Sequence, residues 1–313
     1  MEASSKIFVA GHKGLIGSAI VENLRLRGFN NIVTVDRSQL DLTDKKMVDQ
    51  FFDQQKPEYV ILAAGKVGGI VENKTYPADF MNVNLAIQLN CLQAANRNDV
   101  KKLIFFASSC MYPKVCPQPM SEQALFSGYP EPTSMAYAVS KMAGMQMCLS
   151  YNVQYNCSKF IPIIPNSVYG PNDNFNPESG HVMSALIRRF HEAKAKRIPH
   201  VELWGTGTPR REFIHSDDVA KFCLHVLETE ELAIDLPINI GTGTDYSIAE
   251  LAKEIASVIG YSGDIRWDAS KPDGAPRKLL NSSRAFSMGW RPEITLETGL
   301  YSTYQWYLEN IAD

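Results

Sequence analysis

Tyr137 and Lys141 lie four residues apart in the stretch SMAYAVSKMAG. We expect this stretch to be helical, because Thr133 or Ser134 after Pro132 can cap its start. The two side chains then share one face of the helix. A nearby ammonium favours tyrosinate and lowers the pKa of the phenol. Such a pair can give or take a proton at a carbonyl or hydroxyl group, although the same spacing is common in surface helices.

Ser108 and Cys110 stand at the end of an apolar run, KLIFFA, that is typical of a buried strand. Strand ends in open α/β sheets face the ligand crevice. Ser108 is therefore predicted to donate a hydrogen bond to the substrate oxygen that Tyr137 serves. For Cys110 two interpretations stay open at this point: a small packed apolar side chain, or a thiol that touches the substrate.

A glycine-rich turn, GHKGLIG, places Gly11, Gly14 and Gly17 between a predicted strand and a predicted helix. The first glycine permits a tight turn, the second lets the backbone approach a pyrophosphate, and the third allows close helix packing. The phosphates would lie at the helix N-terminus. The strand before the turn and the helix after it favour dinucleotide binding over ordinary turn chemistry.

Charged residues near this turn give conflicting signals about the cofactor. Asp36 ends the second predicted strand, 19 residues after Gly17, where an acid usually holds the ribose 2′-hydroxyl of NAD. Arg37 and Lys13 can both meet a 2′-phosphate, unless they are ordinary solvated charges. Two cations against one anion favour NADP as the cofactor.

Short apolar runs alternate with amphipathic stretches through the first half of the chain, as in KIFVAG, NIVTVD, YVILAAG, KLIFFASS and KFIPIIP. This alternation predicts an α/β fold with a Rossmann-type, doubly wound parallel sheet. After Tyr169 the loop GPNDNFNPESG leaves the sheet, followed by a basic helix, HVMSALIRRFHEAKAKR, and a strand, VELWG. We expect an NADP-binding domain over 1–169 and a smaller, mixed α/β, mainly substrate-binding lobe over 170–313. The chain is expected to cross back into the first sheet.

The composition is that of an ordinary globular protein, with 313 residues, 45% apolar residues and a net charge of −3. It gives no support for a nucleic-acid or membrane-surface partner. The six cysteines form no CxxC pair, so we expect no metal site. No signal peptide is expected before the first strand. A cytoplasmic protein with reduced thiols is the expectation.

In order and spacing, the glycine turn, Ser108, Tyr137 and Lys141 resemble the extended nucleotide-sugar branch of the short-chain dehydrogenase/reductase superfamily. Longer stretches look like the GDP-L-fucose synthase family, and they cover nearly the whole chain: AAGKVGGIVENKTYPADF, SSCMYPK, PNSVYGPNDNFNPESGHV, WGTGTPRREFIH and DASKPDGAPRKLL. The resemblance implies an NADPH-dependent enzyme that epimerises GDP-4-keto-6-deoxy-D-mannose at C3 and C5 and reduces it at C4 to GDP-L-fucose.

The resemblance also assigns chemical roles, and it gives Cys110 one. A ketone at C4 acidifies the hydrogens on C3 and C5, and inverting both centres requires a base and an acid. The family implies Cys110 and His181 for these roles, since a thiolate and an imidazole can both titrate near neutrality. Tyr137 would protonate O4, and Lys141 would tune Tyr137 and hold the nicotinamide ribose. For His181 the alternative is an ordinary histidine at a helix start.

Binding residues follow from the same resemblance. The implied cofactor contacts are Gly11, His12, Lys13, Gly14, Leu15, Ile16, Gly17, Asp36, Arg37, Leu62, Ala63, Ala64, Lys141, Pro165, Asn166, Val168 and His181. The implied GDP-sugar contacts are Arg189, Trp204, Arg211, Asp273 and Lys278. Arg188 and the KAKR run after it are predicted to be a solvated helix face. Asp217 and Asp218 are predicted to be a helix cap without chemistry.

Two other functions stay open. One is another nucleotide-sugar epimerase or a 4,6-dehydratase of the same branch, although such a dehydratase commonly has an acidic pair beside its catalytic serine or threonine, and SSCM supplies none. The other is a non-catalytic NADP-binding sensor, which an intact YxxxK disfavours. A homodimer built on the YxxxK helix and the helix before it is typical of the superfamily.

Overall fold

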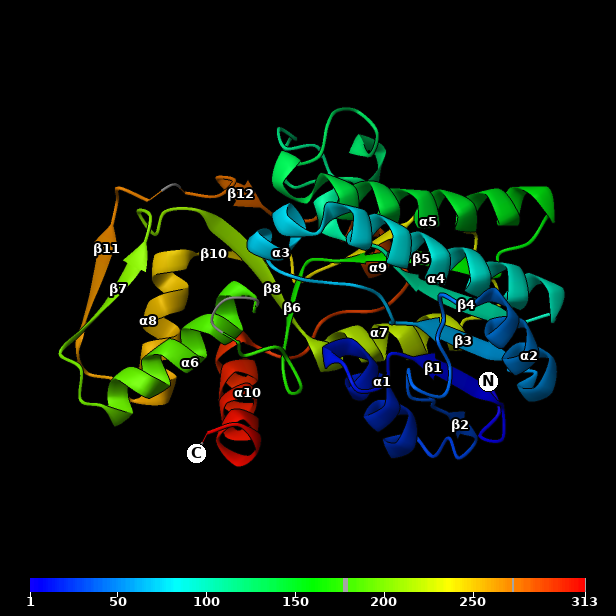
Figure 1. The fold of residues 1–313 in the computed structure, drawn as a ribbon, viewed down its shortest axis with the longest axis horizontal. Coiled ribbons are helices and arrows are strands. Elements are labelled where there is room, and N and C mark those ends of the chain that lie inside the picture. Colours follow the sequence, from blue (N-terminus) through cyan, green and yellow to red (C-terminus); the bar gives the residue numbers. More distant parts are fainter. Residues whose placement is uncertain (177–179, 272, 313) are drawn as a thin grey trace.

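The computed structural model describes residues 1–176, 180–271 and 273–312. Two lobes lie side by side along the long axis of the molecule, and the C-terminal helix belongs to the smaller one (Figure 1). Among the described residues, no helix combines the length and the apolar character that a membrane span requires.

The larger lobe is built on a parallel sheet of six strands in the order β2-β1-β3-β4-β5-β9. Its strands are β1 (Ile7–Ala10), β2 (Ile32–Val33), β3 (Tyr59–Leu62), β4 (Lys102–Phe106), β5 (Phe160–Pro165) and β9 (Ile238–Ile240). The chain runs from β1 outward to β2 and then returns to β3 on the other side of β1. This reversal opens a crevice at the carboxyl ends of β1 and β3. The predicted doubly wound parallel sheet is confirmed.

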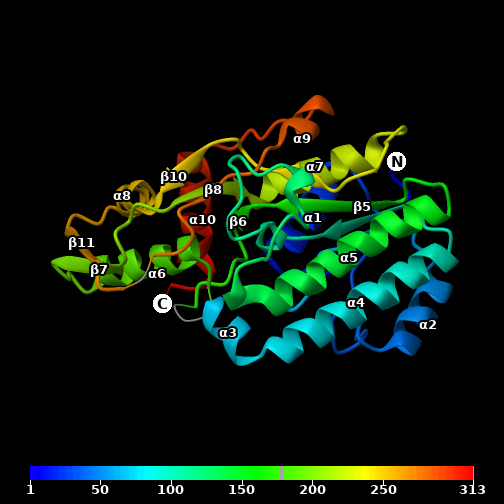
Figure 2. The ribbon, with the colours of Figure 1, turned by 90° about the horizontal axis from the view of Figure 1, so that it is seen from above.

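Helices cover both faces of this sheet, and Figures 1 and 2 show them as two layers. The first layer consists of α1 (Leu15–Leu26), α7 (Ser216–Glu228) and α9 (Ser283–Ser287). The second consists of α2 (Lys45–Gln55), α4 (Pro77–Arg97) and α5 (Met135–Gln154), with short α3 (Ile70–Thr75) preceding α4. Because both faces are covered, β1 and β3 are buried at every position, which explains their continuous apolar runs.

The smaller lobe packs three helices against short strands around a third apolar core. Its helices are α6 (Val182–Ala195), α8 (Ile248–Ile259) and α10 (Leu296–Asn310). Its strands are β6 (Ser167–Tyr169), β7 (His200–Trp204), β8 (Arg210–His215), β10 (Asp245–Ser247), β11 (Asp264–Asp268) and β12 (Arg277–Lys278). Strand β8 is the centre of the larger of the two small sheets, since it pairs with β6, β10 and β12.

The chain passes between the lobes more than once. Strand β6 lies before residue 170 yet pairs with β8 of the smaller lobe. Elements α7, β9 and α9 come after residue 170 yet pack in the larger lobe. A single boundary in the sequence therefore does not separate the two lobes in space. The assignment of one lobe to the cofactor and the other to the substrate stays a prediction.

Several element ends differ from the sequence-based expectation. Strand β2 stops at Val33, so Asp36 lies beyond the strand rather than at its end. Ser134 occupies the N-cap of α5, but its side chain makes no capping hydrogen bond. A single 3₁₀ turn, Pro132–Ser134, leads into the helix instead.

Candidate active site

The glycine turn joins β1 to α1 and packs directly on the end of β3. Gly11 has a φ of +82°, and a Cβ there would lie 2.8 Å from the Ala64 nitrogen and 2.9 Å from the Ala63 oxygen. A Cβ at Gly17 would lie 2.1 Å from the Gly11 oxygen. Only glycine fits at these two positions, because backbone from two neighbouring strands and a helix meets there.

Gly14 differs from the other two glycines. It is the N-cap of α1, with φ −84° and ψ 171°, and a Cβ there would meet the Gly11 oxygen at an ordinary 3.5 Å. No side chain caps the first turn of α1, and no acidic residue occupies it. The first amide groups of the helix, at Leu15 and Ile16, therefore suit an anion, and the turn fits the pyrophosphate of a dinucleotide.

Asp36 is neutralised by the glycine turn. The Lys13 Nζ lies 2.7 Å from Asp36 Oδ1 and 2.8 Å from Oδ2, and the His12 Nε2 lies 3.5 Å from Oδ1. The hydrogen bond from Lys13 lowers the pKa of Asp36. Arg37 is exposed, and it forms no ion pair with another described residue. The three predicted cofactor residues His12, Lys13 and Asp36 thus form one cluster, with Arg37 next to it in the chain.

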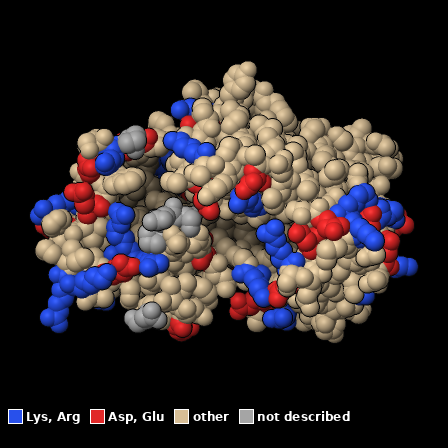
Figure 3. Space-filling model, viewed as in Figure 1, with Lys and Arg blue, Asp and Glu red and all other residues tan. Residues whose placement is uncertain are grey.

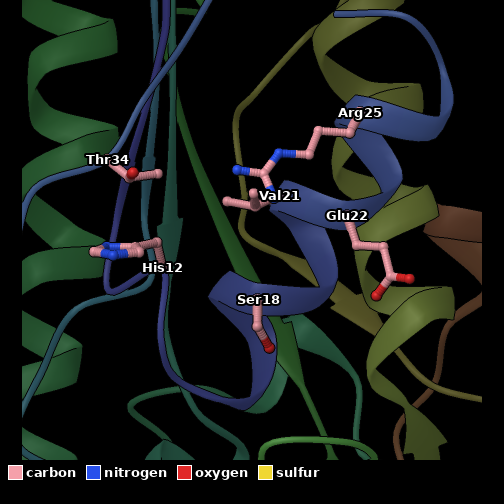
Figure 4. Close-up of a pocket in the computed structure, with 6 residues that line it drawn as sticks. All are labelled: His12, Ser18, Val21, Glu22, Arg25 and Thr34. Atoms are coloured by element: carbon pink, nitrogen blue, oxygen red, sulfur yellow. The ribbon is translucent and has the colours of Figure 1, made fainter.

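A groove of about 370 Å³ lies between α1 and the edge of the sheet (Figure 4). Its lining residues are His12, Ser18, Val21, Glu22, Arg25 and Thr34. In the close-up, Arg25 and Glu22 come from the outer turns of α1, and His12 and Thr34 lie across from them. Of the predicted cofactor residues, only His12 lines this groove. The groove therefore lies beside the glycine turn rather than within the turn.

The chain after β4 brings Ser108 and Cys110 against Tyr137. A 3₁₀ turn, Ser109–Met111, follows the strand, and the Cys110 amide donates a 3.2 Å hydrogen bond to Ser108 Oγ. This turn contacts α5, and Tyr137 is buried there with its ring edge-on to Phe80. Both the Ser108 hydroxyl and the charge of a Cys110 thiolate act on the Tyr137 phenol. Three predicted catalytic side chains are therefore close together.

Burial, rather than Lys141, controls the pKa of Tyr137. Burial and the charge of Cys110 raise this pKa, and the Ser108 hydrogen bond lowers it by less. The expected lowering by Lys141 was wrong for this structure. The Lys141 Nζ lies 5.9 Å from the Tyr137 ring centroid and donates a 2.9 Å hydrogen bond to the Phe106 carbonyl. Burial also lowers the pKa of Lys141 itself, to about 8.

Asn84 holds the loop that passes over Lys141, and the sequence reasoning missed it. Its Oδ1 accepts a 2.9 Å hydrogen bond from the Lys66 amide, and its Nδ2 donates to the Lys66 carbonyl at 3.0 Å. A Cβ at Gly65 would lie 2.9 Å from Asn84 Oδ1 and 3.5 Å from Lys141 Nζ. The sequence gives no clear signal for it, because α4 carries other buried polar residues, Gln88 and Asn90.

Most of the remaining predicted cofactor residues lie at or just after the carboxyl ends of strands in the large sheet. Leu62 ends β3 and leads to Ala63 and Ala64, while Pro165 ends β5. Asn166 is buried, and its Oδ1 accepts a 3.3 Å hydrogen bond from Ser109 Oγ. Val168 lies in β6 opposite Ile214 of β8.

His181 is the N-cap of α6 in the smaller lobe. Its Nδ1 lies 3.9 Å from Asp173 Oδ1, and this carboxylate raises the pKa of His181. The His181 side chain is 55% exposed, whereas Asp173 is buried, so the imidazole is free to reach a ligand. Part of the predicted loop before it, residues 177–179, lies outside the described residues.

Three predicted GDP-sugar residues gather around the end of β7. Trp204 ends this strand and is 70% exposed, with Lys271 Nζ 5.7 Å from its ring centroid. Arg189 on α6 donates a 3.1 Å hydrogen bond to the Glu202 carbonyl of the same strand. Asp273 accepts hydrogen bonds from the amide and the hydroxyl of Thr206, at 3.0 and 2.7 Å.

Arg211 and Lys278, the other two predicted GDP-sugar residues, face each other across β8 and β12. Arg211 Nη1 donates to the Ala275 carbonyl at 2.6 Å, and burial lowers the pKa of Arg211. A hollow separates the lobes on the face shown in Figure 3, and Lys and Arg side chains stand on both sides of it. Arg188 instead pairs with Glu192 on the helix surface, at 2.8 Å.

The model for the NAD dependent epimerase/dehydratase family matches residues 7–241, which include the glycine turn, Ser108, Tyr137 and Lys141. The chain belongs to the NAD dependent epimerase/dehydratase family. Family membership accounts for the glycine turn and for the YxxxK helix on a parallel sheet.

Relatives within this family extend the match to the whole chain. The sequence is 51% identical over 312 residues to "Putative GDP-L-fucose synthase 2" of Arabidopsis thaliana, covering 100% of this chain and 94% of that one. It is 50% identical over 315 residues to the GDP-L-fucose synthase of Escherichia coli strain K12, covering 98% of both. The resemblance to the GDP-L-fucose synthase family is thereby confirmed.

A solved structure gives the same result for the fold. The GDP-mannoheptose C4 reductase of Campylobacter jejuni with NADP bound superimposes with a TM-score of 0.90 at 40% identity. The match covers 98% of this chain and 99% of the reductase. This epimerase/dehydratase family member therefore shares both lobes, and not only the nucleotide fold, with a GDP-sugar reductase.

Proposed function

We propose that the protein converts GDP-4-keto-6-deoxy-D-mannose to GDP-L-fucose, by epimerisation at C3 and C5 and NADPH-dependent reduction at C4. The observation that carries the proposal is the position of Cys110 beside Ser108 and Tyr137. A ketone reductase needs the serine and the tyrosine. A thiol at the same place adds the base that inversion next to a ketone requires. The relatives of matching length support this assignment.

The glycine turn and its neighbours fit NADP. Backbone amides at the start of α1 would hold the pyrophosphate, Lys13 and Arg37 the 2′-phosphate, and Lys141 and Asn166 the nicotinamide end. The NADP-bound reductase with the same fold supports this choice. When bound, NADPH supplies the hydride that reduces C4.

Epimerisation uses Cys110 and His181 on opposite faces of the sugar. The Cys110 thiolate removes a proton from carbon next to the C4 ketone, and the electron pair moves to O4. Ser108 Oγ and the Tyr137 hydroxyl stabilise the charge on O4 by hydrogen bonds. His181 returns a proton to the other face of the same carbon. Asp173 supports this role, because it raises the pKa of His181 and keeps the imidazole protonated closer to neutrality.

Reduction uses Tyr137 as an acid. As C4 accepts a hydride, O4 gains negative charge and takes the phenolic proton of Tyr137. The raised pKa of Tyr137 keeps that proton in place at neutral pH. Lys141, whose Nζ lies 5.9 Å from the Tyr137 ring centroid, would hold the nicotinamide ribose beside the reacting atoms.

The smaller lobe would hold GDP. Arg189, Arg211 and Lys278 offer cations for the diphosphate. Trp204 offers an exposed ring for stacking, and Asp273 offers a carboxylate for the base or ribose.

We further propose that the protein is a homodimer in the cytoplasm. All six cysteines are free thiols, and α5 carries a shallow groove of about 370 Å³ on its outer surface.

The test is to incubate the purified protein with GDP-4-keto-6-deoxy-D-mannose and NADPH, then NADH, and to identify the product sugar. GDP-L-fucose formed with NADPH supports the proposal. Cys110→Ser should still oxidise NADPH but yield sugar that keeps its C3 and C5 configuration. Cys116→Ser, a change at another partly exposed thiol, is the matched control and should leave the product unchanged. No oxidation with either cofactor would refute the assignment.

A further inference from the structure

Glu212 is a fully buried carboxylate at the junction of the two lobes. It lies in the middle of β8, one residue after Arg211, and its exposed fraction is 0%. A charged group inside a protein costs free energy unless its oxygens accept hydrogen bonds. Burial raises the pKa of Glu212, and hydrogen bonds from its surroundings oppose the rise.

Three segments that are far apart in the sequence donate to this carboxylate. The Asn166 Nδ2 donates to Oε2 at 2.7 Å, and the Leu280 amide donates to the same oxygen at 3.0 Å. The Gly243 amide donates to Oε1 at 2.7 Å. These segments follow β5, β12 and β9, so Glu212 joins strands of both main sheets. Each partner is a donor, and an ionised carboxylate, which only accepts, suits all of them.

The position of the carboxylate is sterically fixed. A Cβ at Gly241 would lie 2.4 Å from Glu212 Oε1, so the carboxylate packs directly on backbone. A larger side chain at residue 241 would displace it. The carboxylate therefore has a single position, and its hydrogen bonds have one defined geometry.

Glu212 also helps to set the orientation of the Asn166 amide. The Asn166 NH₂ group donates to the carboxylate at 2.7 Å and to the Lys278 carbonyl at 3.3 Å, so the Asn166 Oδ1 faces away from both acceptors. That Oδ1 accepts the 3.3 Å hydrogen bond from Ser109 Oγ. Ser109 is buried and lies between Ser108 and Cys110 in the turn after β4. A continuous chain of polar contacts thus leads from Glu212 to the residues proposed to act on the substrate.

We propose that Glu212 is a positioning residue, which through Asn166 and Ser109 fixes the turn that carries Ser108 and Cys110. The inference rests on the proposed function, because this placement matters only if Cys110 and Ser108 act on the sugar. Tyr137 is held separately, on α5 and by packing against Phe80. Loss of Glu212 therefore slows proton removal at C3 and C5 more than it weakens cofactor binding.

The test incubates the protein with GDP-4-keto-6-deoxy-D-mannose in D₂O at saturating NADP⁺. It measures the rate at which the C3 and C5 hydrogens of the sugar exchange with deuterium. Glu212→Gln keeps the shape of the side chain but turns one acceptor into a donor that opposes another donor. We expect the exchange rate to fall about 10- to 100-fold, as for a misplaced catalytic group, and to fall by a larger factor than the affinity for NADP⁺.

Asp218→Asn is the matched control. Asp218 is also fully buried, and its carboxylate accepts 3.0 Å hydrogen bonds from the Glu293 and Ile294 amides, away from the turn. The Asp218→Asn change should lower the melting temperature, as Glu212→Gln does, but leave the rate of hydrogen exchange on the sugar unchanged. If Glu212→Gln does not fold, Ser109→Ala breaks the chain of contacts at its other end, and the same selective loss is expected.

The outcomes separate the two proposals. If wild-type protein exchanges neither hydrogen, the proposed epimerisation fails and the role of Glu212 falls with it. If wild type exchanges both and Glu212→Gln, or Ser109→Ala in its place, exchanges them equally fast, only the positioning role is refuted. An equal loss of exchange in Asp218→Asn also refutes it, since the effect is then one of general stability.

Discussion

At the scale of single residues, we expect the Lys13–Asp36 pair to decide how well the protein distinguishes NADPH from NADH. Lys13 cannot fully serve a 2′-phosphate while Asp36 holds it at 2.7 Å. We expect Asp36→Asn to raise the affinity for NADPH relative to NADH by roughly 3- to 10-fold, because the change removes an exposed negative charge beside the negative 2′-phosphate. The effect should be smaller at high salt, which screens exposed charges. Fluorescence titration with both cofactors at two ionic strengths measures this ratio.

Asp49→Asn is the control for the Asp36 variant, since Asp49 also pairs with two cations, Lys45 and Arg97, but lies on α2. The cofactor ratio should not change in this control. An unchanged ratio in Asp36→Asn as well would mean that the 2′-phosphate does not bind beside Asp36.

Lys141 is expected to cost stability at neutral pH. Burial lowers its pKa from 10.5 to about 8. Between these values the unfolded chain keeps a proton that the folded chain has released, so this group makes stability rise with pH. Lys141→Met should raise the free energy of unfolding at pH 7 by about 1–3 kcal/mol, and the gain should shrink as pH rises toward 10.

Urea unfolding of wild type and Lys141→Met across this pH range tests the prediction. The difference between the two proteins cancels the titration of groups they share, such as the buried thiols of Cys91, Cys148 and Cys223. A gain that stays constant with pH would show that Lys141 remains charged when buried. The variant should also lose reductase activity.

Residue types and spacing in the sequence predicted which side chains could do chemistry, but not their environments. The prediction for Tyr137 failed in sign, because spacing gives a neighbour at i+4 and does not reveal that burial outweighs it. Glu212 was missed for a related reason. Its partners Asn166, Gly243 and Leu280 are brought together only by the tertiary fold.

At the scale of elements, we expect the β1–α1 turn to contain one glycine that is needed for folding and another that is needed for binding. A Cβ at Gly17 would lie 2.1 Å from the Gly11 oxygen, whereas one at Gly14 meets it at 3.5 Å. Gly17→Ala should lower the free energy of unfolding by about 1–3 kcal/mol. Gly14→Ala should change it by less than about 0.5 kcal/mol, yet weaken NADPH binding at least roughly tenfold, a loss of about 1.4 kcal/mol.

Chemical denaturation and cofactor titration of the two glycine variants check this separation, and each variant serves as control for the other. A Gly14→Ala protein that binds NADPH normally would place the pyrophosphate away from the start of α1. A Gly17→Ala protein as stable as wild type would show that α1 can shift without cost.

Elements with strong periodic patterns were predictable, and those governed by local packing were not. The buried strands β1, β3, β4 and β5 follow from their apolar runs. Strand β2 was predicted too long. Its apolar run continues beyond Val33, but among the described residues it pairs with β1 alone, through two residues. No local signal shows that β6 pairs with β8 across 40 residues of sequence.

At the scale of the whole molecule, the two lobes are joined by more than one passage of the chain. Strand β9 returns to the large sheet beside β5, and Asn166 immediately after β5 bonds to the strand that centres the smaller lobe. The two lobes are thus joined by hydrogen bonds where they meet. A sequence can indicate that its two halves differ in the pattern of apolar and polar residues. The connection between the lobes, in contrast, depends on which strands pair in the tertiary fold.

The outer face of α4 and α5 is where we expect a second copy of the chain to bind. These helices lie side by side on one surface of the larger lobe (Figure 2). Leu89 on α4 is 42% exposed, and α5 adds the groove beside Met147 and Tyr151. A stable dimer buries about 1,600 Å² in total, and a carboxylate in its centre would be desolvated without a partner. Leu89→Glu should therefore convert a dimer into a monomer in sedimentation experiments.

Leu26→Glu is the control for this variant. Leu26 is more exposed than Leu89 but lies on α1, against the opposite face of the sheet, so the change should leave the dimer intact. A wild-type protein that sediments as a monomer, or a Leu89→Glu protein that stays dimeric, would rule out this face as the interface.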